Sequence, residues 1–530
     1  MMETKEAVMK EFVRAFMDRC HESVGGSVSS IKISLAKELN LGYVPSNLEI
    51  LGAITEESKR RELARILRVK PVRTASGVSI ITVVTPPSRC PHGRCVYCPG
   101  GVDHGTPQSY TGEEAIVRLA SMSSYEPYLQ AKRKVEVLRS MGHDVDKVEL
   151  IVIGGTFTAF PIEFQRHFLK LCIEAVAGLE AVTLEEALVK AESSSRRISG
   201  ITVETRPDCV SMEQANVLIE MGVTRVELGV QALDDEIYRI CKREHTVADV
   251  VRSTKILKDL AFKICYHLMP NLPGSSYEKD LEMFKEVFDN PDFRPDMLKI
   301  YPTLVLPSTE LYDMWRDGRY RPYEDEELVN LLCECLSIVP PYVRVIRVQR
   351  EIPLRLAAAG NRLYNLRETI ERKLKVNGRP CRCIRCREAG HKALKEGIYP
   401  DMDCVELKVL KYEASDGLEY FLSYEDVKND ILLGFIRLRI PSESLRPELE
   451  DAALVRELHV YGQMTPVGDK PSDASWQHRG LGSKLLSEAE RISIEEGCKK
   501  VAVISGVGVR KYYYEHGYVK EGAYVTKKLY

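Results

Sequence analysis

The sequence predicts an α/β protein in which a partial TIM-like (βα) barrel is followed by a smaller domain built on a mixed sheet. Two patterns carry this prediction. Between residues 76 and 355, β-branched apolar runs alternate with helical segments, as expected for the strands of a parallel sheet. Toward the C-terminus, further strand-like runs precede a glycine-rich turn that opens a strong helix.

The chain has 530 residues and exceeds the usual size of a single domain, so we expect several regions. We predict a helical, basic N-terminal region (1–75), the barrel (76–355), a basic linker (356–400) and the C-terminal domain (401–530). The sequence shows neither a signal-peptide pattern nor an apolar run long enough to span a membrane. These features predict a cytoplasmic protein that does not enter membranes.

Composition limits what the chain as a whole can bind. Apolar residues make up 44% and charged residues 29%, which is ordinary for a globular protein. The net charge is −2, so any binding of nucleic acid must come from local basic patches.

Two stretches have a basic surplus. Residues 56–73 contain seven Lys or Arg against three Glu, which we interpret first as a solvated helix face and second as a phosphate-binding helix. Residues 342–387 contain thirteen Lys or Arg against three Glu. A surplus of that size repels itself unless an anion binds, and a tRNA backbone is a natural partner. Separately solvated faces are the weaker alternative.

The barrel strands are predicted from apolar, β-branched runs, and polar residues follow several of them. In such folds the site lies at the C-terminal ends of the strands. Gly154-Gly155 follows the second strand and Glu204 ends the third. A tight turn alone would also explain the two glycines. The expected strands are 79–85, 147–153, 200–204, 224–231, 263–269 and 296–302.

A cysteine loop directly follows the first of these strands. Cys90, Cys95 and Cys98 are spaced C-x4-C-x2-C, so three thiolates can hold three irons of a [4Fe-4S] cluster. The fourth iron is then free to bind a small molecule, which suits radical chemistry with S-adenosylmethionine. A structural zinc loop, completed by His92 or His104, is the alternative.

A second cysteine cluster lies in the basic linker. Cys381, Cys383 and Cys386 are spaced C-x-C-x2-C, which predicts another metal site, most simply for zinc. His391, Cys404 or a residue elsewhere could supply the fourth ligand, and a second iron–sulfur cluster is the alternative. Because six of fifteen cysteines fall in two short motifs, we expect metal binding in a reducing compartment.

The C-terminal region predicts an acyl-CoA site. Strands are expected at 406–412, 431–440, 453–461 and 500–505, with a helix at 483–497. The loop Gln477 to Gly482 opens that helix, whose free N–H groups and dipole favour a pyrophosphate. A tyrosine of the run Tyr512 to Tyr514 can position or protonate the CoA sulfur, although core packing also explains tyrosines there.

These motifs resemble known families. The cysteine loop, the Gly-Gly-Thr turn and Glu204 resemble the radical S-adenosylmethionine superfamily, whose usual cluster spacing is C-x3-C-x2-C. The C-terminal loop and helix resemble the GNAT acetyltransferases. The strings CVYCPGG, QSYTG, GHDVDKVELIVIGGTFTAFP, ITVETRPD, ELGVQ and MPNLPG resemble the family of the catalytic subunit of Elongator, from about residue 70 to the C-terminus.

The resemblance implies roles for individual residues. Gly154 and Gly155 would contact the methionine amino group, and Glu204 the ribose or carboxylate. A structural zinc ion is implied at the second cysteine cluster. The acetyl-CoA residues would be Glu457, Leu458, His459 and Val460 along the pantetheine, Gln477, Gly480, Leu481, Gly482 and Ser483 at the pyrophosphate, Tyr512 or Tyr513 at the thioester, and Lys147 from the barrel.

The function implied is that of a tRNA wobble-uridine acetyl/carboxymethyltransferase. A 5′-deoxyadenosyl radical would take a hydrogen atom from the methyl group of acetyl-CoA, and the carbon radical would add to C5 of an unstacked uridine. Thioester hydrolysis would leave 5-carboxymethyluridine. The expected partners are the tRNA anticodon arm and acetyl-CoA.

Several alternatives remain open at this point. A protein lysine acetyltransferase would use only the C-terminal domain, and a non-catalytic tRNA-binding protein would have a purely structural cluster. A homodimer is compatible with the sequence. Accessory subunits are not expected for a stand-alone archaeal or bacterial form.

Overall fold

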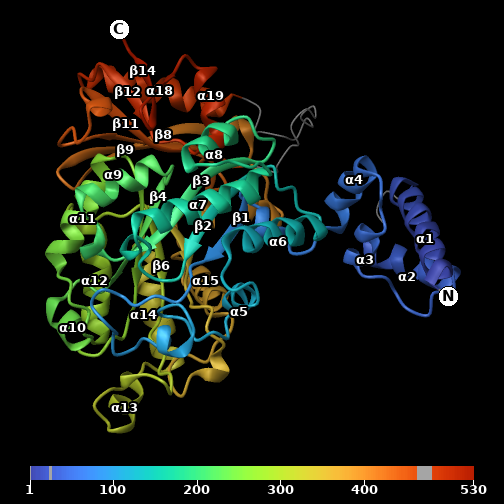
Figure 1. Ribbon diagram of the computed structural model, residues 1–530, viewed down its shortest axis with the longest axis horizontal. Helices are drawn as coiled ribbons and strands as arrows, with labels where there is room; N and C mark the ends of the chain where they lie inside the picture. The colour runs from blue at the N-terminus through green and yellow to red at the C-terminus, as the bar shows by residue number, and fades with distance from the viewer. Residues whose placement is uncertain (1, 23–26, 462–479) are drawn as a thin grey trace.

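The computed structural model describes residues 2–22, 27–461 and 480–530 (Figure 1). The N-terminal helices stand beside the main body and enclose a small core around Phe12, Phe16 and Leu63. These helices pack closely on the main body. Gly142 of the main body leaves little space there, because a Cβ added to it would lie 3.1 Å from Leu51 Cδ1 of the N-terminal helices. These helices are α1 (Met2–Glu22), α2 (Val28–Glu38), α3 (Asn47–Gly52) and α4 (Glu57–Leu67).

The barrel is an open, seven-stranded sheet. Its strands follow one another in the order of the sequence, and every neighbouring pair is parallel. The sheet does not close on itself, because β1 and β7 each pair on one side only. The strands are β1 (Ser79–Val84), β2 (Lys147–Ile153), β3 (Arg197–Thr205), β4 (Arg225–Gln231), β5 (Lys263–Leu268), β6 (Met297–Ile300) and β7 (Arg344–Arg347).

Helices cover the outer face of this sheet (Figure 1). Apolar side chains such as Phe168 and Leu169 are buried between a helix and the strands, which leaves the concave side of the sheet for polar residues. The helices of this part are α5 (Ala115–Ser121), α6 (Pro127–Ser140), α7 (Ile162–Ala177), α8 (Leu184–Ala191), α9 (Met212–Glu220), α10 (Asp235–Ile240), α11 (Val247–Asp259), α12 (Tyr277–Asp289), α13 (Glu310–Arg316) and α14 (Asp325–Ser337).

The basic stretch 342–387 contains more structure than the sequence suggested. Its first residues form β7, which was not predicted, and α15 (Leu366–Val376) and α16 (Ile384–Arg387) follow, with α17 (Ala389–Glu396) just beyond. Six of its thirteen cations pair with carboxylates, several of them on distant segments, so the sequence count overstates the free positive charge. The pairs are Arg344–Glu388, Arg347–Glu351, Arg355–Glu113, Arg367–Glu371, Arg382–Asp430 and Arg387–Glu425.

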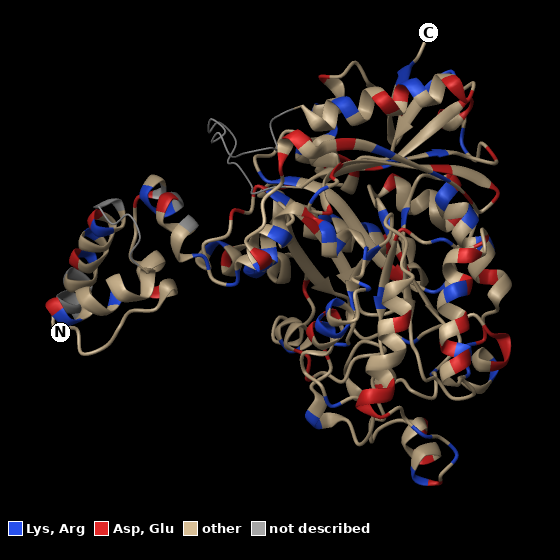
Figure 2. Cartoon of the chain, turned by 180° about the vertical axis from the view of Figure 1, so that it is seen from behind, with Lys and Arg blue, Asp and Glu red and all other residues tan. Residues whose placement is uncertain are grey.

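Basic and acidic residues are also interspersed over the rest of the described chain. Basic and acidic segments alternate along the main body and the N-terminal helices (Figure 2). No helix in the described ranges is both long and apolar enough to cross a membrane.

The C-terminal domain is a mixed, seven-stranded sheet in the order β13-β14-β12-β11-β10-β9-β8. Its one parallel pair is β11 with β12, and their pairing ends at Val455 and Val503, beyond which the strands separate. Strands β9, β13 and β14 were not predicted. The bounds are β8 (Val405–Ala414), β9 (Gly417–Asp426), β10 (Ile431–Ile440), β11 (Ala452–Val460), β12 (Lys500–Val503), β13 (Val519–Glu521) and β14 (Tyr524–Lys528), with helices α18 (Leu481–Glu495) and α19 (Arg510–Tyr514).

The two sheets meet across buried ion pairs. Arg456 of β11 binds both oxygens of Asp296, which directly precedes β6, at 2.5 and 2.8 Å. Arg439 of β10 binds Asp259 of α11 at 2.6 Å. All four side chains are fully buried, so removing one partner would leave an uncompensated charge in the interior. The predicted fold class, an open barrel plus a mixed sheet, is confirmed, while the four regional boundaries stay predictions.

Candidate active site

The loop that contains Cys90, Cys95 and Cys98 is fixed at the C-terminal end of the barrel. Val96 N–H donates to the Cys241 carbonyl at 3.2 Å, and Leu311 N–H donates to the Val96 carbonyl at 2.9 Å. These bonds tie the loop to the segments that follow α10 and begin α13. Cys95 and Cys98 are buried, and Cys90 is half-buried.

Hydrogen-bond donors surround the three sulfur atoms. Arg243 Nη1 lies 3.8 Å and His92 Nε2 3.1 Å from Cys95 Sγ, while Gln108 Nε2 lies 3.4 Å from Cys98 Sγ. Burial raises the pKa of Cys90 to about 11, so this thiol needs a compensating positive charge to ionise. Such donors are the groups that stabilise metal-bound thiolates. Gln108 opens the string QSYTG, which was quoted without a role, and no motif pointed to Arg243.

The three sulfurs of this loop are not among the groups in the described part of the chain whose ligand atoms all lie within 4.8 Å of one another. A single ion needs such close ligands, whereas the irons of a cube each take one thiolate at a separate corner. The wider arrangement therefore fits a cluster better than a zinc ion.

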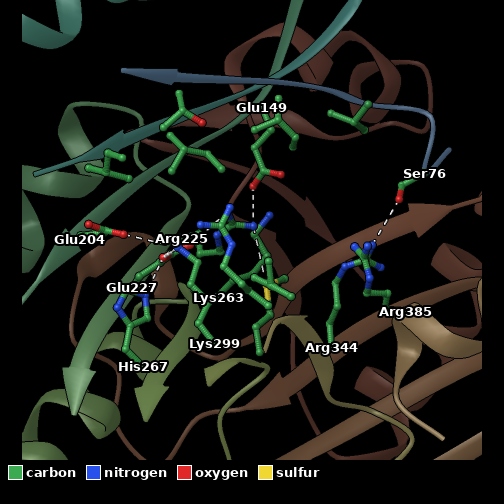
Figure 3. A pocket seen from close by; sticks show the side chains of 18 of the residues that line it. Ser76, Glu149, Glu204, Arg225, Glu227, Lys263, His267, Lys299, Arg344 and Arg385 are labelled. Atoms are coloured by element: carbon green, nitrogen blue, oxygen red, sulfur yellow. Dashed lines mark hydrogen bonds and ion pairs between the residues drawn. The ribbon is translucent and has the colours of Figure 1, made fainter. Parts of the chain in front are cut away.

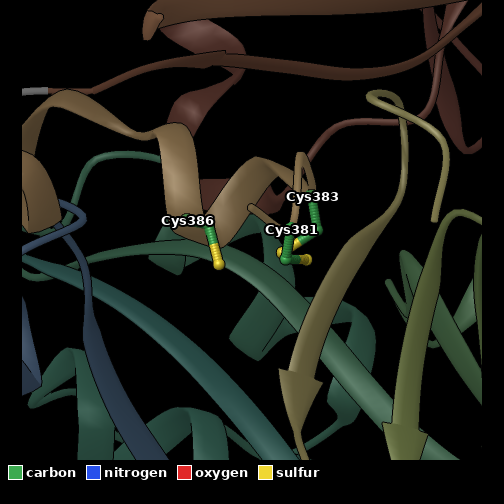
Figure 4. Close-up of side chains that lie close together, drawn as sticks. All are labelled: Cys381, Cys383 and Cys386. Atoms are coloured by element: carbon green, nitrogen blue, oxygen red, sulfur yellow. The ribbon is translucent and has the colours of Figure 1, made fainter. Parts of the chain in front are cut away.

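The second cysteine cluster has the opposite geometry. Cys381, Cys383 and Cys386 have sulfurs within 4.8 Å of one another, around the start of α16 (Figure 4). Tetrahedral zinc, with Zn–S bonds of about 2.3 Å, requires such spacing. Arg367 Nη2 lies 3.6 Å from Cys386 Sγ and 3.9 Å from Cys383 Sγ.

Neither predicted fourth ligand belongs to this second group. His391 Nε2 pairs with Glu388 Oε1 at 3.0 Å. Cys404 Sγ donates to Asp401 Oδ2 at 3.6 Å. The close group of the second cluster contains three cysteines and no further His, Cys, Asp or Glu from the described ranges.

One continuous cavity of about 1170 Å³ joins the cysteine loop to the C-terminal domain. It runs along the concave side of the open sheet from the C-terminal to the N-terminal strand ends. Most predicted site residues line it: Cys90, Cys95, Cys98, Lys147, Gly155, Glu204, Glu457, Leu458, His459, Val460, Gly480, Gly482, Ser483, Tyr512 and Tyr513.

Other predicted residues do not line this cavity. Gly154 has φ +128° and shapes the turn, because a Cβ there would lie 2.2 Å from Thr85 Oγ1. Leu481 has a buried side chain, although its backbone begins α18. Gln477 lies outside the described residues. The cysteines of the second cluster also lie away from the cavity lining.

The middle of the cavity is lined by buried charges that sequence reasoning missed (Figure 3). Glu227 of β4 accepts bonds from Lys299 and, at 2.8 Å, from His267. Burial alone would raise the pKa of Glu227, but Lys299 and its other cationic neighbours outweigh burial and lower that pKa well below its ordinary value. The signal that could have revealed Glu227 is a carboxylate between Val226 and Leu228 in a buried strand, at the start of the string ELGVQ.

The far end of the cavity lies between β11 and α18. Gly480 is in the left-handed conformation and begins α18, whose first N–H groups are free to meet an anion. Tyr512 Oη is buried without a hydrogen-bond partner in the structure. Tyr513 packs within the core of this domain, and Tyr514 bonds Glu192 at 3.2 Å, away from the cavity.

Comparison with known proteins agrees with this architecture. The sequence matches the ELP3 N-terminal domain over residues 2–75, the Radical SAM superfamily over 84–287, the Radical SAM C-terminal domain over 295–376 and the acetyltransferase (GNAT) family over 392–518.

Several relatives match along nearly their whole length. A protein of Methanocaldococcus jannaschii named tRNA uridine(34) acetyltransferase is 46% identical, with 100% of this chain and 99% of the relative covered. Elongator complex protein 3 of Danio rerio is 43% identical, with 100% and 97% covered. The solved archaeal Elp3 of Methanocaldococcus infernus, with its N-terminus deleted, is 44% identical with a TM-score of 0.76, covering 86% of this chain and 99% of that one. The chain therefore belongs to the family of the tRNA uridine(34) acetyltransferases and Elongator complex protein 3.

Proposed function

We propose that this chain is an acyltransferase that converts the wobble uridine of tRNA into 5-carboxymethyluridine, with acetyl-CoA as the source of the two carbons. The observation that carries the proposal is that residues of the cysteine loop and residues at the start of α18 line the same cavity. Two chemistries that are usually separate can therefore act on one substrate.

The residues at the cluster end suit a [4Fe-4S] cluster and S-adenosylmethionine. When bound, these groups supply a 5′-deoxyadenosyl radical that removes a hydrogen atom from the acetyl methyl group. Cys90, Cys95 and Cys98 would hold the cluster. Gly155 and Glu204 line the cavity beside it, where they can orient the methionine and ribose parts.

The residues at the other end suit acetyl-CoA. The start of α18, with Gly482 and Ser483, would hold the pyrophosphate through free backbone N–H groups. The last residues of β11 would follow the pantetheine arm. Of the two candidate tyrosines, we favour Tyr512 at the thioester, because its buried hydroxyl has no partner within the described chain, whereas Tyr513 packs within the core.

We further propose that Cys381, Cys383 and Cys386 hold a structural zinc ion. Their close sulfurs and the nearby Arg367 guanidinium suit a site in which thiolate charge is neutralised. The fourth position has no protein ligand assigned.

The remaining proposals concern partners and location. Arg372, Lys375 and Arg379 lie on α15 and the segment after it and make no salt bridge with a described residue. They are available for tRNA phosphates, with the anticodon arm at the cavity mouth. We also propose a cytoplasmic enzyme that works without accessory subunits, and a homodimer stays an open prediction.

Anaerobic reconstitution tests the function. The iron-loaded protein is incubated with a one-electron reductant, S-adenosylmethionine, acetyl-CoA and tRNA, and 5′-deoxyadenosine and the nucleosides of digested tRNA are measured by mass spectrometry. We expect both 5′-deoxyadenosine and 5-carboxymethyluridine. Absence of both from a fully loaded protein would refute the proposal, and acetyl transfer to a lysine peptide without tRNA modification would support the protein acetyltransferase instead.

A further inference from the structure

The cations at the N-terminal end of the barrel form a separate feature of the cavity. Lys147, Arg197, Arg225 and Lys263 are the first residues of β2, β3, β4 and β5. The parallel register places Lys147 opposite Arg197, and Arg225 opposite Lys263. All four line the cavity. The sheet therefore gathers four positive side chains at the edge opposite to the cysteine loop.

Three of these cations make no salt bridge within the described ranges. Arg225 pairs with Glu149 at 2.6 Å (Figure 3), whereas Lys147, Arg197 and Lys263 make no salt bridge with any residue the structure describes. Arg197 Nε is buried without a hydrogen-bond partner. Half-buried like charges repel one another unless an anion is bound between them.

Two of the carboxylates nearby already have partners. Glu149 is paired with Arg225, and Glu457 accepts a bond from Arg437 Nε at 3.0 Å. Burial and the charges of Arg197 and Lys263 lower the pKa of Lys147 to about 8. The charges that act on Lys147 are therefore predominantly positive.

The three cations lie toward the acyl end of the predicted acetyl-CoA groove. The start of α18 marks the pyrophosphate end. It lies beside the last residue of β11, because a Cβ added to Gly482 would lie 3.7 Å from Val460 Cγ2. Glu457 precedes Val460 by about 10 Å of extended strand. Lys263 lies near Glu457, and its positive charge lowers the pKa of that carboxyl. An extended arm that follows β11 away from the pyrophosphate therefore leads toward Lys263.

The same end is in contact with β3. The segment after β12 packs directly on the start of that strand, because a Cβ at Gly508 would lie 2.6 Å from Arg197 Cα. The point where β11 and β12 separate thus opens toward Arg197 and Lys263 rather than toward the cysteine loop.

We propose that Lys147, Arg197 and Lys263 form a carboxylate-binding site that stabilises the oxyanion of thioester hydrolysis and then holds the carboxylate product. This inference rests on the proposed function. The oxygen of water bonds to the thioester carbon, and the carbonyl oxygen becomes the oxyanion. The carbon–sulfur bond then breaks, the sulfur takes one proton of the water as free CoA thiol, and the second proton is released from the carboxylic acid.

His459 lines the same cavity, and its ring can receive a proton in this step. Burial and the charge of Lys147 lower the pKa of His459 to about 4, so the ring is neutral near pH 7. Its Nε2 lies 3.1 Å from the Ser76 carbonyl, which can only accept, so Nε2 carries the hydrogen. Nδ1 is then the acceptor.

The test separates the radical step from hydrolysis. Cluster-loaded wild type, Lys263→Met and Arg197→Met are supplied with a one-electron reductant, S-adenosylmethionine, acetyl-CoA and tRNA, and 5′-deoxyadenosine, free thiol and intact tRNA mass are followed. We expect 5′-deoxyadenosine at the wild-type rate, thiol release slower by about 10²–10³-fold, and tRNA that carries a CoA thioester. Lys263→Arg should restore part of the rate, and Lys285→Met, on the exposed face of α12, serves as the matched control.

Two outcomes would overturn the site. One is thiol release at the wild-type rate in both methionine variants. The other is an equal loss of CoA affinity and rate, which would assign the cations to the CoA phosphates. If the wild type forms no 5′-deoxyadenosine, the proposed function fails, and NMR titration of the full chain with sodium acetate decides the site alone: weaker acetate binding in Lys263→Met supports it, and unchanged binding refutes it.

Discussion

The two cysteine clusters of this chain contain the same three ligands but differ in every feature that decides what they bind. Cys90, Cys95 and Cys98 lie on a loop at the end of the barrel, their sulfurs are spread apart, and they line the cavity. The cysteines of the second cluster have sulfurs within 4.8 Å and lie outside the cavity lining. The spacing of the cysteines in the sequence distinguishes the two clusters poorly. The distances between their sulfur atoms and their position relative to the cavity distinguish them well.

The largest effect is expected from the first cluster. Cys98→Ser should remove iron and abolish carboxymethyluridine formation, because a cube bound by only two thiolates loses an anchored corner. Zinc content and the unfolding midpoint should stay at wild-type values. Iron and zinc are measured by elemental analysis, with Cys20→Ser in α1 as the control. Retention of iron in the Cys98 variant would contradict the assignment.

The second cluster should respond in the opposite way. Cys383→Ser should remove zinc and lower the free energy of unfolding by more than about 4 kcal/mol, since a lost structural metal belongs to the most damaging class of change. Urea unfolding measures this loss. Iron content per folded molecule should not change, and a variant with unaltered stability would show that no structural ion is held there.

A smaller effect is expected from a residue beside the second cluster that does not itself bind the metal. Arg367→Met leaves all three thiolates of the second cluster but removes the guanidinium that lies 3.6 Å from Cys386 Sγ. We expect zinc affinity to fall by about 10–100-fold, measured by competition with a chelator. Arg372→Met on the same helix is the control. Equal affinities in both variants would mean that Arg367 serves only its pair with Glu371.

The smallest effect concerns acid, and it tests the interface between the sheets, away from both clusters. Burial alone would raise the pKa of Asp296, but Arg456 and Arg437 outweigh burial and hold that pKa well below its ordinary value of 3.8. A carboxyl with a lowered pKa adds stability above 3.8 that is lost as the pH falls toward the folded value. The unfolding free energy should therefore change little between about pH 7 and pH 5 through this group and decline below about pH 4.

Asp296→Asn is the matched variant for that measurement. It should be less stable at neutral pH and should show a flatter decline in acid, because the titrating group is gone. A wild type and a variant with parallel pH profiles would show that Asp296 does not contribute to acid unfolding.

Much of the fold was accessible from local pattern. The strand at 147–153 was predicted with the bounds that the structure shows, because a run rich in β-branched residues ends there in two glycines. Strand β7 was missed because its sequence, Arg-Val-Ile-Arg, is short and charged. It is a strand because the edge of β6 is available to pair with it.

The sequence by itself determined the chemistry this protein can perform. It shows which cysteines are grouped in motifs, where a glycine turn must follow a strand, and where a helix begins with a free N-terminus. These depend on neighbours along the chain. Only the tertiary structure decided that both chemistries share one cavity and that Glu113 and Asp430 neutralise distant arginines. It also decided that Lys147, Arg197 and Lys263, which make no salt bridge with a described residue, lie at the same end of the parallel sheet. Coulomb and packing energies depend on distance in space, and the register of parallel strands sets that distance for residues far apart in the sequence.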